Sequence, residues 1–190
     1  MQQGFQYLKD VYEYDEHQTL FTIKVALDSY QDLFNKLDPS PIRRRDISPD
    51  LRAFLEDCSS EIPLKYKTRI NLVISQESKD ALTEREITTS LKNYFSYVLN
   101  VNYNHIRIKK LRAFKYMIFS ISAIILAVLL RTWLPNAILS SVAIESVTIA
   151  SWVFLWETIS VNFIQMDELS MNQKKYQRLK SGDIIYSYPA

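Results

Sequence analysis

Glu145 is the residue whose type and position point most directly to chemistry, because it is the only charge in a stretch of twenty residues, 137–156. If that stretch crosses a bilayer, an unpaired carboxylate there costs about 2.5–3.5 kcal/mol. One interpretation is functional: Glu145 relays a proton or an ion, or Glu145 and the adjacent Ser146 contact a second subunit. The other is structural: a protonated Glu145 bonds to a hydroxyl. The candidate hydroxyls are those of Ser120, Ser122, Ser146 and Thr148.

Two groups of basic residues are candidate contacts for an anionic partner or lipid. The first lies in a loop that also holds three aspartates and comprises Arg43, Arg44 and Arg45. It either binds a phosphate or another anion, or it is a solvated loop whose ion pairs contribute ~0–1 kcal/mol each. The second precedes the first apolar stretch and comprises Arg107, Lys109, Lys110 and Arg112. Basic residues there attract anionic headgroups, each contributing about 1 kcal/mol.

No motif in the sequence indicates catalysis, a metal site or a cofactor. Cys58 is the single cysteine, and His17 and His105 lie far apart in the chain. Two glycines in the whole sequence cannot build a phosphate-cradling loop. A net charge of +2 is too small to indicate nucleic acid. We therefore expect a protein that is not an enzyme, has no metal or cofactor and binds no nucleic acid.

Two apolar stretches predict a transmembrane hairpin. Residues 116–130 carry no charge, and with their flanks they give a first span over 113–131. A turn is expected at 132–136, where Pro135 breaks a helix, and a second span at 137–157. Tryptophans suited to the headgroup region anchor the ends, namely Trp133, Trp152 and Trp156. A buried hairpin in a soluble core is the alternative, but apolar residues surround both helices and no other segment is large enough to cover them.

The flanking charges predict the orientation of this hairpin. Five basic residues lie within 107–115 and four within 174–180, whereas the predicted turn has Arg131 alone beside it. The positive-inside rule therefore places both termini in the cytoplasm. The first five residues have neither a basic region nor an apolar run, so no secretory signal is expected.

The remaining sequence predicts a small α+β domain over 19–112, with a β-α-β-α order. Alternation predicts strands at 20–27 and 67–75, and helical spacing predicts an amphipathic helix from Pro49 to about residue 60 with Cys58 buried on it. Thr83 and Glu86 form a capping box for a helix that runs, kinked near 100–104, into the first span. Residues 1–18 are expected to be an N-terminal segment. The C-terminal tail, 158–190, should hold a helix over 167–179 and a strand over 184–188 that joins the sheet.

These residues also resemble a family of uncharacterised bacterial membrane proteins. The resemblance rests on LFNKLDPSP at 33–41, RDISPD at 45–50 and WVFLWE at 152–157, followed by a basic segment with Lys174 and Lys175. It implies an N-terminal α/β region before two transmembrane helices, in an inner membrane, and it implies no activity. The chain departs from the pattern at Thr158, where the family would have a proline, and in lacking a basic residue near the exit of the second span.

From this pattern we expect an oligomeric membrane anchor or sensor that binds an unknown protein partner through its cytoplasmic domain. Small residues four apart would let helices approach closely, in the hairpin or between copies; these are Ala123 with Ala127 and Ser146 with Ala150. The alternative is a channel-like or membrane-perturbing effector that assembles as a homo-oligomer around Glu145. A membrane-bound enzyme acting on lipid or nucleotide is a third class, disfavoured by the absence of motifs.

Overall fold

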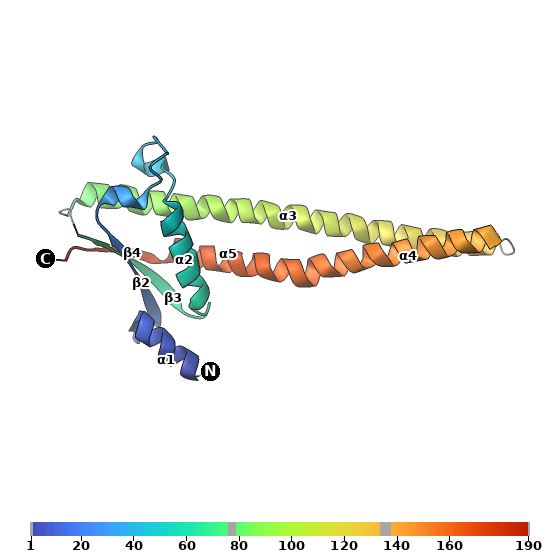
Figure 1. The fold of residues 1–190 in the computed structure, drawn as a ribbon, viewed down its shortest axis with the longest axis horizontal. Coiled ribbons are helices and arrows are strands. Elements are labelled where there is room, and N and C mark those ends of the chain that lie inside the picture. The colour runs from blue at the N-terminus through green and yellow to red at the C-terminus, as the bar shows by residue number, and fades with distance from the viewer. Residues whose placement is uncertain (1, 76–78, 134–137, 190) are drawn as a thin grey trace. The chain divides into compact units, whose positions relative to one another are not determined.

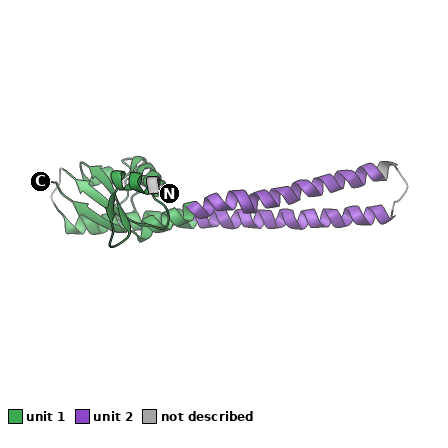
Figure 2. Cartoon of the chain, turned by 90° about the horizontal axis from the view of Figure 1, so that it is seen from below, with its two compact units in different colours: residues 1–100, 172–190 green, residues 101–171 purple. Residues whose placement is uncertain are grey.

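The computed structural model describes residues 2–75, 79–133 and 138–189. The chain divides into two compact units, which Figure 2 shows in different colours. The first contains residues 1–100 and 172–190, and the second contains residues 101–171. The first is a mixed α and β unit, and the second consists of helices only in the part that is described.

The α/β unit is built on a four-stranded sheet in the order β1-β2-β3-β4. β1 (Glu13–Asp15) is antiparallel to β2 (Leu20–Leu27), whereas β2, β3 (Lys67–Ile74) and β4 (Asp183–Ser187) are all parallel. The strands expected at 20–27 and 67–75 are therefore confirmed. The C-terminal strand expected at 184–188 is also confirmed, and it joins the sheet as an edge strand beside β3.

Alternating side chains of the sheet build the core of this unit. Ile23 and Val25 of β2, and Ile70 and Leu72 of β3, are all buried. They pack against apolar residues of α2 (Pro49–Glu61), which includes the predicted helix, and of α3 (Ala81–Trp133). Cys58 of α2 is buried as expected, and burial raises the pKa of its thiol. Short 3-10 turns at Tyr30–Leu33 (η1) and Ile42–Arg44 (η2) lie in the connection from β2 to α2.

The N-terminal segment contains regular structure that we did not expect. Helix α1 (Gln2–Val11) and strand β1 both lie within this segment. Aromatic contacts hold both elements against the rest of the α/β unit. The ring of Tyr14 in β1 lies 4.6 Å, centroid to centroid, from that of Phe21 in β2. The ring of Phe5 in α1 stacks on that of Tyr66 at 5.6 Å. Phe5, Leu8 and Tyr12 recur at helical spacing, which is a local signal for α1 that the sequence analysis did not use.

Helix α3 differs from expectation at its start and along its length. Asp80 provides the cap, because its carboxylate accepts hydrogen bonds from the Leu82 N–H at 3.0 Å and from the Thr83 hydroxyl at 2.6 Å. The expected capping box of Thr83 and Glu86 is therefore wrong, since Thr83 already lies inside the helix. α3 is assigned as one α-helix from Ala81 to Trp133, with no interruption at 100–104, where a kink was expected.

The connection between the adjacent parallel strands β3 and β4 contains every described residue of the helical unit (Figure 1). After α3 the chain forms α4 (Ile138–Ser160), a π-helical turn at Val161–Gln165 (η3) and α5 (Met166–Ser181), and then enters β4. Gly182 makes this entry possible, because a Cβ there would lie 2.6 Å from the Thr68 carbonyl oxygen. The sheet therefore closes only when the chain returns from the helical unit.

Within the helical unit, α3 and α4 are antiparallel and touch through small side chains. The Ser120 hydroxyl donates to the Ser151 carbonyl at 2.8 Å, and the Thr158 hydroxyl lies 3.4 Å from the Ala113 carbonyl. Both helices are long and apolar enough to cross a membrane, and only 17% of each apolar window is buried in the structure. Most of the expected turn at 132–136, and residue 137, lie outside the described residues.

Candidate functional site

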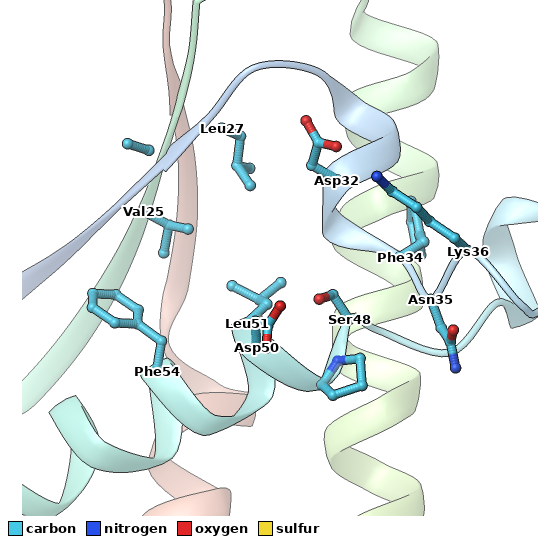
Figure 3. A pocket seen from close by; sticks show the side chains of 12 residues that line it. Val25, Leu27, Asp32, Phe34, Asn35, Lys36, Ser48, Asp50, Leu51 and Phe54 are labelled. Carbon is cyan, nitrogen blue, oxygen red and sulfur yellow. The ribbon is translucent and has the colours of Figure 1, made fainter.

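A pocket of 590 Å³ lies at the carboxyl end of β2, beside the start of α2 (Figure 3). Its apolar wall includes Val25, Leu27, Leu51 and Phe54. Ligands of sheets with parallel strands commonly bind at the carboxyl ends of those strands, because the loops that follow can project functional groups there. The volume lies in the usual range for a small-molecule site, about 300–1,000 Å³.

The polar groups of this pocket come from the β2–α2 connection and from the first turn of α2. Asp32, Lys36 and Ser48 line one side, and Asp50 lies at the second position of the helix. One oxygen of Asp32 accepts the Ser29 N–H at 3.0 Å. The Ser48 side chain makes no capping hydrogen bond to α2. Among the described residues, neither aspartate nor the lysine takes part in a salt bridge.

Phe54 is an apolar lining residue whose side chain stays accessible. It lies on the predicted apolar side of α2 with Leu51, Leu55 and Cys58, and these three neighbours are buried. Phe54 instead remains 45% exposed at the pocket. The sequence could not predict this pocket, because its walls come from residues up to thirty positions apart.

The three arginines of the first basic group are brought together against α3. Arg43, Arg44 and Arg45 line a 290 Å³ pocket with Asn93, Tyr94 and Tyr97. The Arg43 Nε lies 3.2 Å from a Glu86 carboxylate oxygen, and the Arg45 Nε donates to the Asp38 carbonyl at 2.6 Å. Asp38 in turn accepts the Asp46 N–H at 2.8 Å, and this bond lowers the pKa of the Asp38 carboxyl. Anion binding at this pocket stays a prediction.

Glu145 and Ser146 both lie on the exposed surface of α4. Each hydroxyl considered as a partner for Glu145 donates to a backbone carbonyl instead: Ser120 to Ser151, Ser122 to Ile118, Ser146 to Val142 and Thr148 to Ile144. No hydrogen bond to the Glu145 carboxylate occurs among the residues that the structure describes. The antiparallel register places Glu145 level with Leu126, about 7–8 Å from Arg131 along the helix axis.

The small residues that line the contact between α3 and α4 recur every seven positions rather than every four. They are Ala113, Ser120 and Ala127 in α3, and Ser151 and Thr158 in α4, and all are buried. Of the pairs predicted for close approach, Ala127 is buried and Ala123 is half-buried, whereas Ser146 and Ala150 are exposed. The outer face of α4 therefore carries Glu145 and Ser146.

The second basic group and the tryptophans remain on the surface of the helical unit. Arg107, Lys110 and Arg112 are exposed and Lys109 is half-buried, and within the described part of the chain none forms a salt bridge. Trp133, Trp152 and Trp156 are each at least 65% exposed. These side chains are accessible to whatever surrounds the helices.

Arg178 has a structural role that the sequence analysis missed. It is one of the four basic residues at 174–180 that led us to predict the orientation of the hairpin, but its side chain is buried in the α/β unit. One guanidinium nitrogen, Nη1, donates to the carbonyls of Ile62 and Pro63, both at 3.0 Å. The other, Nη2, donates to the carbonyl and hydroxyl of Ser59. Burial without an acidic partner lowers the pKa of this guanidinium.

The C-terminal strand is held to α3 by two tyrosines. The Tyr186 hydroxyl donates to the Glu84 carbonyl at 2.8 Å, and the Tyr188 hydroxyl donates to the Glu84 carboxylate at 2.6 Å. Burial raises the pKa of Tyr186 to about 12. Its hydroxyl therefore stays protonated, and able to donate, to a higher pH than that of an ordinary tyrosine.

Within the described ranges, no group of histidine, cysteine, aspartate or glutamate side chains could hold a metal ion. No protein-family model matches the chain, and no curated protein or solved structure is significantly similar to it.

Proposed function

We propose that this chain is an integral membrane protein in which the helical unit anchors a non-enzymatic binding domain, the α/β unit, in the cytoplasm. The proposal extends to an inner-membrane location, to a homo-oligomer and to a protein partner bound through the α/β unit. The observation that carries it is the position of both apolar helices between two hydrogen-bonded strands of one sheet.

This connection constrains the topology of an inserted chain. Because β4 pairs with β3, residues 67–74 and 183–187 must lie on the same side of any membrane. The chain between them must therefore cross an even number of times, and α3 and α4 are two helices with suitable length and composition. A hairpin satisfies this condition, whereas a single crossing would separate the two strands.

The hydroxyl groups of the two apolar helices support placement of the helical unit in lipid. In hydrocarbon a polar group without a partner is costly, because no water is present to bond to it. The hydroxyls of Ser120, Ser122, Ser146, Thr148, Ser151 and Thr158 all donate to backbone carbonyls. Large apolar side chains such as Ile118, Ile125 and Val153 project outward. The exposed basic residues before residue 116 favour a cytoplasmic α/β unit by the positive-inside rule.

Single cysteines would test this topology. In a Cys58→Ser background, we expect Asp57→Cys and Gln177→Cys to react with a membrane-impermeant maleimide only from the cytoplasmic side, and Trp133→Cys only from the opposite side. Asp57 and Gln177 are exposed residues of the α/β unit, and Trp133 is the last residue of α3. Labelling is measured in intact spheroplasts and in inverted vesicles.

The parent protein provides the control, because its buried Cys58 should stay unlabelled until the protein is denatured. Reaction of all three introduced cysteines from one side would exclude a crossing hairpin. Reaction of Asp57→Cys and Gln177→Cys from opposite sides would exclude the sheet as an intact unit in the membrane.

A second candidate function, an effector that assembles around Glu145, is favoured by the exposure of this carboxylate on an apolar helix surface. A carboxylate facing lipid is costly, so a neighbouring copy would be its most favourable surrounding. We expect native mass spectrometry in nanodiscs to detect a discrete oligomer that Glu145→Leu dissociates. The control is Val142→Leu, an exposed position one turn away on α4. Monomers for the parent protein would exclude this candidate, and an oligomer that survives Glu145→Leu would remove Glu145 from the contact.

A further inference from the structure

We propose that the pocket at the carboxyl end of β2 binds a small amphipathic amine, with its apolar body on the wall of the pocket and its ammonium attracted by the carboxylates that line it, Asp32 and Asp50. This inference rests on the proposed role of the α/β unit as a binding domain. It does not depend on membrane insertion, because every lining residue lies within 25–54.

The apolar wall would receive the body of the ligand. Val25 and Leu51 are buried, whereas the ring of Phe54 is partly exposed, and Figure 3 shows these three side chains among those that line the pocket. An aromatic or branched aliphatic group would cover Phe54 and remove apolar surface from water, which is the main source of affinity in such pockets. A purely polar ligand would leave this surface uncovered.

The charges around the wall select the sign of the ligand. The charged lining residues are two carboxylates, Asp32 and Asp50, and one ammonium, that of Lys36, so the lining has a net charge of −1. Neither carboxylate has an ion-pair partner within the described residues. One Asp32 oxygen already accepts a backbone N–H, which positions the carboxylate and leaves its other oxygen for a ligand. The pocket of Arg43–Arg45 has the opposite charge and would select anions.

Three indole compounds separate the effect of charge from that of the apolar body. Tryptamine is a cation, tryptophan a zwitterion and indole-3-acetate an anion, and all carry the same ring. With the full chain in nanodiscs, isothermal titration should give tryptamine the lowest Kd, at least tenfold below that of indole-3-acetate, with tryptophan between them. Equal affinity for the three, or tighter binding of tryptophan or indole-3-acetate, would overturn the proposal.

Variants localise the site. Asp32→Asn and Asp50→Asn should each raise the Kd for tryptamine about tenfold, while Asp57→Asn, an exposed position on α2 outside the pocket, should leave it unchanged. Thermal melting would verify that each variant is folded. An unchanged Kd in both pocket variants would place tryptamine in the lipid or elsewhere and overturn the assignment. The cysteine labelling described above reports on the anchor separately, so failure of the pocket and failure of the topology are distinguishable.

Discussion

Arg178→Met should lower the free energy of unfolding of the α/β unit by about 3 kcal/mol. Hydrogen bonds from a charged donor contribute about 1.5–3 kcal/mol each. A buried carbonyl left without any donor costs about 1–3 kcal/mol, because it has lost its hydration and gained no partner. Removing the buried charge offsets part of this loss, because a buried cation is itself costly. The balance is destabilising because several backbone carbonyls depend on one guanidinium.

These carbonyls lie at the end of α2 and just after it, where a helix has no N–H groups left to satisfy them. Arg178 reaches Ser59 and Ile62 at the end of the helix, and Pro63 beyond it. A helix end buried against a sheet cannot use water instead. Arg178 is only 8% exposed, and it reaches this helix end from the last turn of α5, four residues before Gly182. Its loss should therefore loosen β4 as well as α2.

The free energy of unfolding is measured by urea titration of the protein in nanodiscs. Hydrogen exchange of the β3 and β4 amides then reports whether β4 has loosened. Lys180→Met is the matched control, because Lys180 is a basic residue of the same helix turn with an exposed side chain. Arg178→Lys should recover only part of the stability, since an ammonium cannot present the two-armed geometry of a guanidinium. A loss below 1 kcal/mol in Arg178→Met would show that water satisfies these carbonyls.

Arg178 also illustrates what the sequence could not reveal. Like Lys174 and Lys180, it follows the second apolar stretch, and the positive-inside rule treats these basic residues alike. Only the return of α5 to the sheet distinguishes it, and that contact joins residues more than a hundred positions apart. A consequence for experiments is that residues 1–105 alone would lack both Arg178 and β4, so they are a poor substitute for the whole binding domain.

The elements that were predictable are those with a local signal. Alternation marks β2 and β3, and the sequence Ser48-Pro49 with helical spacing marks α2. The predicted start of α3 is wrong because Asp80 and Thr83 are both residue types that cap helices. The Asp80 carboxylate forms the cap, by accepting the Leu82 N–H. The pocket had no local signal at all, because Val25, Asp32 and Phe54 come from a strand, a 3-10 turn and a helix.

Ile121→Arg should reduce membrane integration of the first apolar helix about a hundredfold if the helical unit lies in a bilayer. Ile121 is 50% exposed on α3 and lies near the middle of the segment between Lys115 and Arg131. In water an exposed substitution of this kind changes stability by less than about 0.5 kcal/mol. In the centre of a bilayer an arginine costs about 2.5–3.5 kcal/mol, and the favourable contribution of the isoleucine is lost as well. The size of the effect of Ile121→Arg therefore shows whether lipid or water surrounds this position.

Tyr103→Arg is the matched control, because Tyr103 is 57% exposed on the same continuous helix but lies before the apolar segment. It should leave integration unchanged, measured as the fraction of protein that resists alkaline extraction from membranes. If Ile121→Arg behaves like Tyr103→Arg, the exposed apolar surface faces water or another protein rather than lipid. The helical unit would then be a water-exposed helix pair or a protein-binding surface, connected to the α/β unit without any membrane crossing.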